Sequence, residues 1–295
     1  MATRQTRLTL AVALAVLALA SVPPVDAQRP APRVERIISV VPALTEVLFA
    51  IGAGPQVVGV SSYDQFPPEV RALPRVGALL DPNTERILTL RPDLVVVYGS
   101  QSELHTQLER AGLRTFSYRH GGVETILDTI GDLGNATGRR TDAERVVNAL
   151  RSRLDAVRAR VSGRPRPRTL LVFERQPGSL RGIYASGGVG FLHDVLEIAG
   201  GENVFADIGR ESVQPSVETL LVRAPDVILE VRATGLLEDR EIGQEQDVWS
   251  ALSSIPAVRN RRVHLLTGDH LVVPGPRLAE ATEAIASALH PDAGN

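Results

Sequence analysis

Residues 83–97 and 216–230 carry the same pattern, with Glu, Leu, Pro and Asp at matching positions. In each copy Asn or Ser follows a proline and can begin a helix, and a glutamate in the first turn suits the helix dipole. The Pro-Asp pair cannot continue that helix, and the apolar, largely β-branched run behind it is typical of a buried strand. A supersecondary unit that recurs far along one chain predicts two similar lobes.

Along the sequence, strand and helix patterns alternate both before and after one long helical segment. Alternation of this kind predicts an α/β fold with two Rossmann-like lobes, each a parallel sheet with flanking helices. Residues 141–161 lack Gly and Pro and carry apolar residues at helical spacing, with Thr141 as the expected cap. They predict one rigid helix of roughly 30 Å that joins the lobes. The expected strands are residues 36–41, 57–60, 94–97, 115–118, 169–173, 227–230 and 263–266.

The N-terminus has the three-part pattern of a secretory signal. Arg4 and Arg7 precede an apolar run, prolines break it, and small residues allow cleavage after Ala27. The run is shorter than the ~20 residues of a spanning helix, although an uncleaved anchor is the alternative. We expect a soluble, exported protein, retained in a compartment such as a periplasm. The expected divisions are a signal peptide at 1–27, an N-terminal lobe at 28–138, a connecting helix at 139–163 and a C-terminal lobe at 164–295.

The composition removes several classes of function. The chain has 32 basic residues apart from His, all of them Arg, and it has no Cys. Lysine-based Schiff-base or P-loop chemistry, disulfides, thiolate metal sites and a lipid-modified cysteine anchor are therefore excluded. The formal net charge of -2 gives no reason to expect nucleic acid or an anionic membrane as a partner.

The ligand site is expected where the loops of the two lobes face each other. In open parallel sheets ligands bind beyond the carboxyl ends of the strands, and two facing lobes make a cleft. Gly187 and Gly188 precede a helix and could hold an anion on backbone N–H groups, or simply form a tight turn. The loops expected at the cleft include Pro42, Ala43, Tyr63, Asp64, Gly99, Ser100, Arg119 and His120 from the first lobe, and Tyr184, Gly187, Gly188, Arg210, Glu211, Ser212, Arg232, Asp269 and Arg277 from the second.

Several segments together form a specific pattern, although each alone is weak: residues 36–46, 57–63, 83–87, 91–94, 199–205 and 276–277. Through them the mature chain resembles the periplasmic substrate-binding proteins of ABC importers for vitamin B12, haem and ferric siderophores, and within them the B12 binders most. The resemblance implies two α/β lobes joined by one long helix, a small-molecule cargo and an ABC permease as partner. We expect a monomer with no resident cofactor or metal site, and a cobalt corrinoid or other metal chelate as cargo.

The resemblance also assigns individual residues. Pro42, Ala43, Tyr63, Asp269 and Arg277 match the family's B12 contacts. One surface glutamate from each lobe docks onto arginines of the permease in this family, and the matching positions here are Glu85 and Glu218. The alternatives are that these acids only complement helix dipoles, that Tyr63 plugs its own lobe, and that Asp269 pairs with Arg277.

Three readings of the function remain open. Aromatic content is only 4%, and the single Trp249 need not face the cleft, whereas a corrin or porphyrin usually meets aromatic walls. His120 and His270 at strand ends leave open haem, a ferric siderophore or a metal ion as the cargo. An exported two-lobed enzyme, such as a chelatase or hydrolase, is the third reading. No nucleophile elbow, paired carboxylates in one loop or metal-ligand triplet supports it.

Overall fold

The computed structural model describes residues 34–233 and 239–294, and residues Val34–Asn295 form one compact unit. The signal segment predicted at 1–27 lies outside the described residues. Within the described range, no helix combines the length and the apolar character needed to cross a lipid bilayer.

The first sheet contains four strands, all parallel, in the order β2-β1-β3-β4. Strand β1 lies in the middle, where Ile38 pairs with Gly59 on one side and Val95 on the other. Its side chains are all buried, as are four of the five in β3. This matches the expected parallel sheet with both faces covered. The strands are β1 (Ile37–Ser39), β2 (Val57–Val60), β3 (Leu94–Tyr98) and β4 (Arg114–Tyr118).

The second sheet is mixed, where a wholly parallel one was expected. Strands β10, β9, β5 and β7 pair in parallel, but β6 is antiparallel to both β5 and β8. The segment between β5 and β6 is too short for a helical crossover, so the chain can only turn back beside β5. The strands are β5 (Arg168–Glu174), β6 (Tyr184–Ser186), β7 (Glu202–Asn203), β8 (Ser212–Val213), β9 (Val227–Arg232) and β10 (Val263–Thr267).

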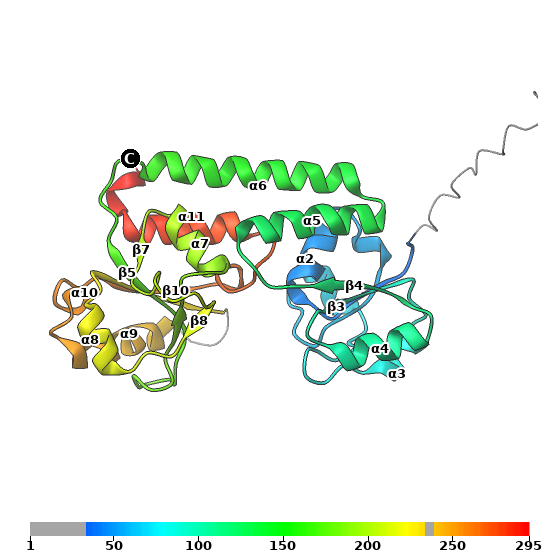
Figure 1. Ribbon diagram of the computed structural model, residues 1–295, viewed down its shortest axis with the longest axis horizontal. Helices are drawn as coiled ribbons and strands as arrows, with labels where there is room; N and C mark the ends of the chain where they lie inside the picture. The colour runs from blue at the N-terminus through cyan, green and yellow to red at the C-terminus, as the bar shows by residue number, and fades with distance from the viewer. Residues whose placement is uncertain (1–33, 234–238, 295) are drawn as a thin grey trace, which may run out of the picture. The chain divides into compact units, whose positions relative to one another are not determined.

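Helices cover both sheets. Figure 1 shows α2 and α5 on one side of the first sheet and α3 and α4 on the other. The α-helices are α2 (Pro42–Ala50), α3 (Thr84–Thr89), α4 (Ser102–Arg110), α5 (Val123–Thr137), α6 (Arg140–Val161), α7 (Phe191–Ile198), α8 (Val217–Arg223), α9 (Asp239–Asp247), α10 (Pro256–Arg259) and α11 (Leu278–Leu289). Short 3-10 helices are η1 (Gly54–Gln56), η2 (Pro68–Ala72), η3 (Val248–Leu252), η4 (Asp269–Leu271) and η5 (Pro291–Gly294).

Two helix starts differ from the sequence-based expectation. Pro42 was expected in a turn, but it is the first residue of α2, because proline's fixed φ suits that position and its missing N–H costs nothing there. Thr141 was expected to cap the long helix, but α6 begins at Arg140 with Arg139 at the N-cap and no side-chain cap. Thr141 therefore lies inside the first turn, and the predicted helix itself is confirmed.

The repeated unit folds in the same way twice. Asn83 caps α3 by accepting a hydrogen bond from the Arg86 N–H (2.8 Å), and Ser216 caps α8 by accepting one from the Thr219 N–H (3.2 Å). A strand, β3 or β9, then follows each helix. The helix–strand unit predicted from the sequence pattern is therefore confirmed in both lobes.

The two copies of the repeat also agree at the junction between the helix and the strand. Arg91 and Ala224, each directly before the proline, both have left-handed backbones with φ of 47° and 45°. The aspartate after the proline then accepts from the backbone at the start of the neighbouring strand: Asp93 from the Arg36 N–H (2.9 Å), and Asp226 from the Arg168 N–H (3.2 Å). The Pro-Asp pair therefore ends the helix and fixes the next strand beside its neighbour.

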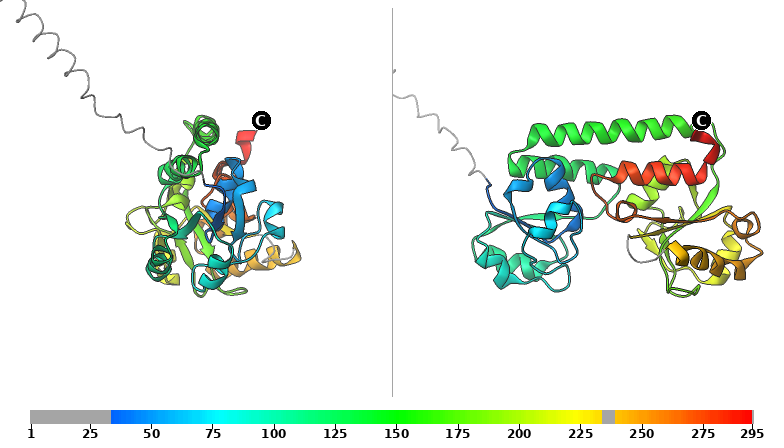
Figure 2. Two further views of the ribbon diagram at one scale, coloured as in Figure 1. Left: turned by 90° about the vertical axis from the view of Figure 1, so that its right-hand side faces the viewer. Right: turned by 180° about the vertical axis from the view of Figure 1, so that it is seen from behind.

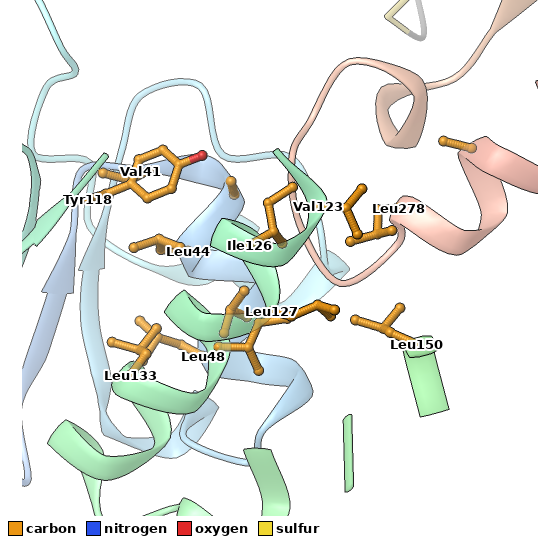
Figure 3. Packing of buried hydrophobic residues seen from close by; sticks show 14 of the residues in the cluster. Val41, Leu44, Leu48, Tyr118, Val123, Ile126, Leu127, Leu133, Leu150 and Leu278 are labelled. Atoms are coloured by element: carbon orange, nitrogen blue, oxygen red, sulfur yellow. The ribbon is translucent and has the colours of Figure 1, made fainter. Parts of the chain in front are cut away.

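One hydrophobic core connects the two lobes. It contains residues of α2, β3 and α5 together with residues of α6, α7, α11 and the second sheet. Figure 3 shows Leu44 and Leu48 of α2 packed against Leu127 of α5, with Leu150 of α6 and Leu278 of α11 beyond them. In Figure 2, α5, α6 and α11 run together along one side of this unit. A second core, around Trp249 and Phe205, covers the other face of the second sheet.

Candidate ligand-binding site

Loops at the carboxyl ends of both sheets meet around a cavity of about 220 Å³. His120 and Gly121 follow β4 of the first sheet, and the remaining lining residues come from β5, the β6–α7 connection, the first turn of α7, and β8 with the residue before it. This is the edge at which ligands bind in open α/β sheets. The lining residues are His120, Gly121, Phe173, Val189, Gly190, Phe191, Leu192, Glu211 and Ser212.

An aromatic cluster lies behind His120. Tyr98 and Tyr118 end β3 and β4, and the His120 ring stacks on Tyr98 (5.9 Å between ring centroids) and meets Tyr118 edge-on (5.0 Å). Tyr118 is only 3% exposed, and its hydroxyl has no hydrogen-bond partner among the described residues. Burial, to which the neighbouring Tyr98 and Glu211 groups add, raises the pKa of Tyr118 well above its ordinary value. The hydroxyl therefore stays protonated and can donate a hydrogen bond toward this region.

The loop after β2 presents Tyr63 to solvent. Tyr63 is 71% exposed, so it does not plug its own lobe. Below it, buried Asp64 accepts from the Ser61 N–H (2.6 Å), and Arg75 donates to the carbonyl oxygens of Ser61 and Asp64 (2.9 Å each). Burial raises the pKa of the Asp64 carboxyl to about 7, against the opposing hydrogen bonds of Thr45 and the Ser61 amide. The backbone around Tyr63 is thus held firmly while its ring stays free.

Arg277 holds the far end of the same loop. Its guanidinium pairs with buried Glu46 of α2 (Nε to Oε2, 2.8 Å) and lies 4.1 Å from the centre of the Phe66 ring. Burial raises the pKa of Glu46, an effect that the hydrogen bond and charge of Arg277 oppose. Arg277 therefore joins the segment before α11 to the first lobe, which is a contact that the sequence did not predict.

The backbone N–H groups of Gly187 and Gly188, before α7, donate hydrogen bonds within the protein. The Gly187 N–H donates to the Glu211 carbonyl oxygen (3.1 Å) and the Gly188 N–H to that of Ile208 (2.8 Å). A β-carbon on Gly187 would lie 2.0 Å from the Arg210 carbonyl oxygen, and one on Gly188 would lie 2.2 Å from that of Ala206. Close packing of backbone against backbone thus accounts for both glycines, and this favours the tight turn over the anion site.

A buried ion network supports the second lobe at its ligand-facing edge. Arg175, directly after β5, is 3% exposed, and its Nε donates to Oε2 of Glu230 in β9 (3.0 Å). Its Nη1 lies 2.7 Å from Oε2 of Glu245, and the Trp249 indole N–H also donates to Glu230 (3.1 Å). Arg232 forms a second ion pair with Glu230. Trp249 therefore lies in the core and not at the cleft.

The remaining predicted residues fall into three groups. Ser212 lines the cavity, and Tyr184 is half-buried against Phe173, which also lines it (6.2 Å between ring centroids). Pro42 and Asp269 are half-buried, whereas the Ala43 side chain is buried at 5% exposure. The described residues contain no group of three or more His, Cys, Asp or Glu side chains arranged to hold a metal ion.

The two repeat acids are exposed. Glu85 and Glu218 lie in the first turns of α3 and α8, and neither makes an ion pair within the described residues. The Ser216 hydroxyl and the backbone at Glu218 hold the pKa of that carboxyl below its usual value. Because each helix runs antiparallel to the strand that follows it, both first turns lie level with the carboxyl ends of the strands.

The structure adds Phe66 and Phe173 to the residues that the sequence suggested. Phe66 stands in the same loop as Tyr63, and the aromatic character of that loop is the one signal that could have pointed to it. Phe173 lies within a β-strand pattern and has no local signature, because only the tertiary fold brings it to the cavity. Glu211, in the loop before β8, was expected at the cleft and lines the cavity.

Comparisons with known proteins agree with this architecture. The family described as "Periplasmic binding protein" matches residues 37–269. The vitamin B12-binding protein of Salmonella typhimurium is 32% identical over 256 residues, which cover 86% of this chain and 90% of that protein. The chain therefore belongs to this family of periplasmic binding proteins, whose members include the substrate-binding components of ABC transporters.

Solved structures show the same two-lobe fold. The periplasmic vitamin B12 binding protein BtuF of Vibrio cholerae is 28% identical, with a TM-score of 0.75 over 89% of this chain and 99% of that one. The periplasmic heme-binding protein RhuT of Roseiflexus sp. RS-1 is 26% identical, with a TM-score of 0.73 over 88% and 99%. The similar proteins named here are binding proteins and not enzymes.

Proposed function

We propose that this chain captures cobalamin or a related corrinoid between its lobes and delivers it to the permease of an ABC importer. The similarity to vitamin B12-binding proteins along nearly the whole described chain carries the proposal. The candidate site supports it. Its loops run from β2, which precedes Tyr63, to β4, which precedes His120. These strands are three spacings apart, roughly 14 Å at about 4.8 Å each, which suits a large ring better than a bare ion.

Aromatic side chains on both lobes suit a flat ligand. Tyr63 and Phe66 are 71% and 40% exposed on the first lobe, and Phe173 and Tyr184 form a tilted pair on the second. The low overall aromatic content is therefore concentrated where a macrocycle would be held. We include Pro42, Ser212 and Asp269 as further ligand contacts. Ala43 acts on the site through its backbone, because its side chain is buried. Arg277 acts through its ion pair with Glu46, and not as a free side chain.

Haem is the second candidate cargo. The haem-binding relative has the same fold, and the buried Tyr118 hydroxyl beside His120 offers an oxygen and a nitrogen near the cavity. Absorbance titrations with cyanocobalamin and with haemin separate the two. We expect saturable binding of cyanocobalamin and a rise in melting temperature with ligand concentration. Binding of haemin alone would reassign the cargo, and binding of neither would refute both candidates.

Glu85 and Glu218 are proposed to dock the protein on the permease. They occupy equivalent positions on the two lobes, are exposed, and lack ion-pair partners within the described residues. Acids at the rim of an interface set register and association rate by pairing with cations of the partner. We expect Glu85→Ala with Glu218→Ala to abolish cyanocobalamin uptake while the Kd for cyanocobalamin stays unchanged. Normal uptake by this double variant would remove the assignment.

Location and motion follow from the same proposal. The chain would be exported as a monomer into the periplasm after cleavage near Ala27, without a lipid anchor. Its lobes, proposed at 28–138 and 164–295, share one core around the connecting helix, so closure on the ligand should be small. Scattering curves of the free and the cyanocobalamin-bound protein should nearly coincide, and a wide difference would contradict this rigid connection.

A further inference from the structure

Exposed aliphatic side chains accompany both docking acids. Leu88 and Leu221 occupy the same position in the two copies of the repeat, three residues after the acid, and each is 41% exposed. Val222 follows at 84% exposure, and Leu80 in the loop before α3 reaches 93%. Single exposed apolar residues are ordinary, but their recurrence beside equivalent acids in both lobes is not expected from folding alone.

Helix geometry places Leu88, Leu221 and Val222 next to the acids. Residues three and four apart in a helix lie on one face, so Leu221 and Val222 share a face with Glu218. Leu88 shares a face with Glu85 in the same way. Figures 1 and 2 show α3 and α8 on the side of this unit away from α6, so neither patch is near the shared core.

The loop that carries Leu80 is held in place, so its exposure belongs to an ordered structure. Gly77 has a φ of 85° and sits so close to Asp81 that a β-carbon would lie 2.2 Å from its carbonyl oxygen. The buried Gln101 side chain donates to the Leu79 carbonyl oxygen (3.0 Å), and the Asn83 N–H donates to that of Val76 (2.9 Å). The chain thus keeps Leu80 in water at a fixed place.

The charge beside the apolar patches is not neutralised locally. Arg223 on α8 turns to Asp207, with two hydrogen bonds of 2.9 and 2.8 Å, and lies over the Phe205 ring. Glu218 is therefore left for a cation outside the described chain. A second copy of this protein would place acid against acid, and anionic lipid would also repel both patches. A protein partner with arginines beside apolar depressions fits both features.

We propose that Leu80, Leu88, Leu221 and Val222 form two apolar anchors that dock onto the permease beside Glu85 and Glu218. This inference rests on the proposed function and assigns the two kinds of residue different tasks. The acids guide association and register, which salt weakens, whereas the apolar anchors supply affinity that salt does not screen. Buried apolar side chains at the centre of a contact dominate its affinity.

The test compares three double variants of the full chain. Leu80→Ser with Val222→Ser makes the most exposed residue of each anchor polar, Leu80→Met with Val222→Ile keeps both positions apolar, and Glu85→Ala with Glu218→Ala removes the acids. The probe is the permease complex that supports cyanocobalamin uptake with this chain, in lipid nanodiscs at about 0.05 and about 0.5 M NaCl, which differ widely in screening length. We expect the serine pair to raise the Kd for the permease about tenfold or more at both salt concentrations.

The other variants make the result specific. The Met and Ile pair should bind the permease as the wild type does, and the acid pair should lose affinity chiefly at low salt. All three should keep the wild-type Kd for cyanocobalamin. Wild-type protein that binds cyanocobalamin but not the permease would refute the delivery function. Permease binding that requires the acids but is unchanged in the serine pair would refute only the anchors.

Two further outcomes would overturn the choice of partner. Sedimentation that shows a wild-type dimer lost in the serine pair would assign the anchors to a second copy of the chain. Flotation with vesicles of phosphatidylcholine and phosphatidylglycerol that lack permease, lost in the serine pair, would assign them to lipid. We expect neither, because acids flank both patches.

Discussion

The two lobes contain the same helix–strand unit but fix their ligand-facing loops by different means. In the first lobe the strands are all parallel, and one buried carboxyl, Asp64, organises the loop that carries Tyr63. In the second lobe one strand, β6, runs antiparallel to its two neighbours, and Arg175 joins Glu230, Glu245 and the neighbouring loop in an ion network.

This difference has a physical reason. After β2 only residues 61–64 fold around the Asp64 carboxyl, whereas the carboxyl edge of the second sheet must hold a hairpin, α9 and η3 together. Arg175 carries five donors in a rigid fork and can bridge several elements at once. The second lobe therefore depends on a buried cation and the first on a buried acid, and each dependence can be tested.

The largest effect is expected from Arg175→Leu. Removing the cation takes the ion-pair partner from Glu245 and leaves Glu230 with Arg232 alone among the described residues, and such a break in a buried network should lower the free energy of unfolding by about 3–5 kcal/mol. Urea denaturation followed by circular dichroism measures the change. As a control, Arg223→Leu breaks the exposed pair with Asp207, and its cost should stay below about 1 kcal/mol. Equal losses in the two variants would mean that the buried network has no special role.

The next effect concerns Asp64 and depends on pH. Its pKa is about 7 in the folded protein against an ordinary value of 3.8, so the folded state binds the proton more tightly than the unfolded one. The contribution of Asp64 to stability is therefore present below about pH 4 and is lost as pH rises toward 7 and above. Asp64→Asn should abolish this loss, so the variant should gain on the wild type as pH rises.

Thermal melts of both proteins from about pH 3 to about pH 8 span the two pKa values of Asp64 and measure the difference. Taking the difference cancels the opposite contributions of His264 and His270, whose pKa values burial lowers. Arg75 and Glu46 face the same region and should be unchanged in the variant. A difference that stays constant with pH would show that Asp64 titrates normally.

The sequence predicts the features that depend on residues close together in the chain, and it does not predict contacts between residues far apart in the chain. The repeat, the caps Asn83 and Ser216 and the connecting helix depend on neighbours within a few residues, and all were predictable. The pair between Glu46 and Arg277 spans 231 positions, and no local pattern marks either partner. The binding edge is likewise assembled by topology, because its lining residues from the two lobes meet only after both sheets have formed.

A smaller effect tests the contact between the lobes. Asp194 of α7 accepts a hydrogen bond from the Val123 N–H (2.7 Å) and so caps α5 from the other lobe. Asp194→Ala should cost about 1 kcal/mol and speed hydrogen exchange in the first turn of α5. Asp128→Ala, an exposed site on the same helix, should change neither. Unchanged exchange in the Asp194 variant would show that the lobes are held together without this cap.

The smallest effect compares the two copies of the repeat directly. Asn83→Ala and Ser216→Ala each remove a cap and should each cost about 1 kcal/mol, with the larger loss at Asn83 because its hydrogen bond is shorter, 2.8 against 3.2 Å. Asn83→Asp and Ser216→Thr keep an acceptor and should restore most of the stability. Only Ser216→Ala should also raise the pKa of Glu218 toward its ordinary value, since the serine hydroxyl helps to lower it. Carboxyl chemical shifts measured against pH would detect this change in the pKa of Glu218. Its absence would mean that the two cap residues do not differ in their effect on the glutamate of their own copy.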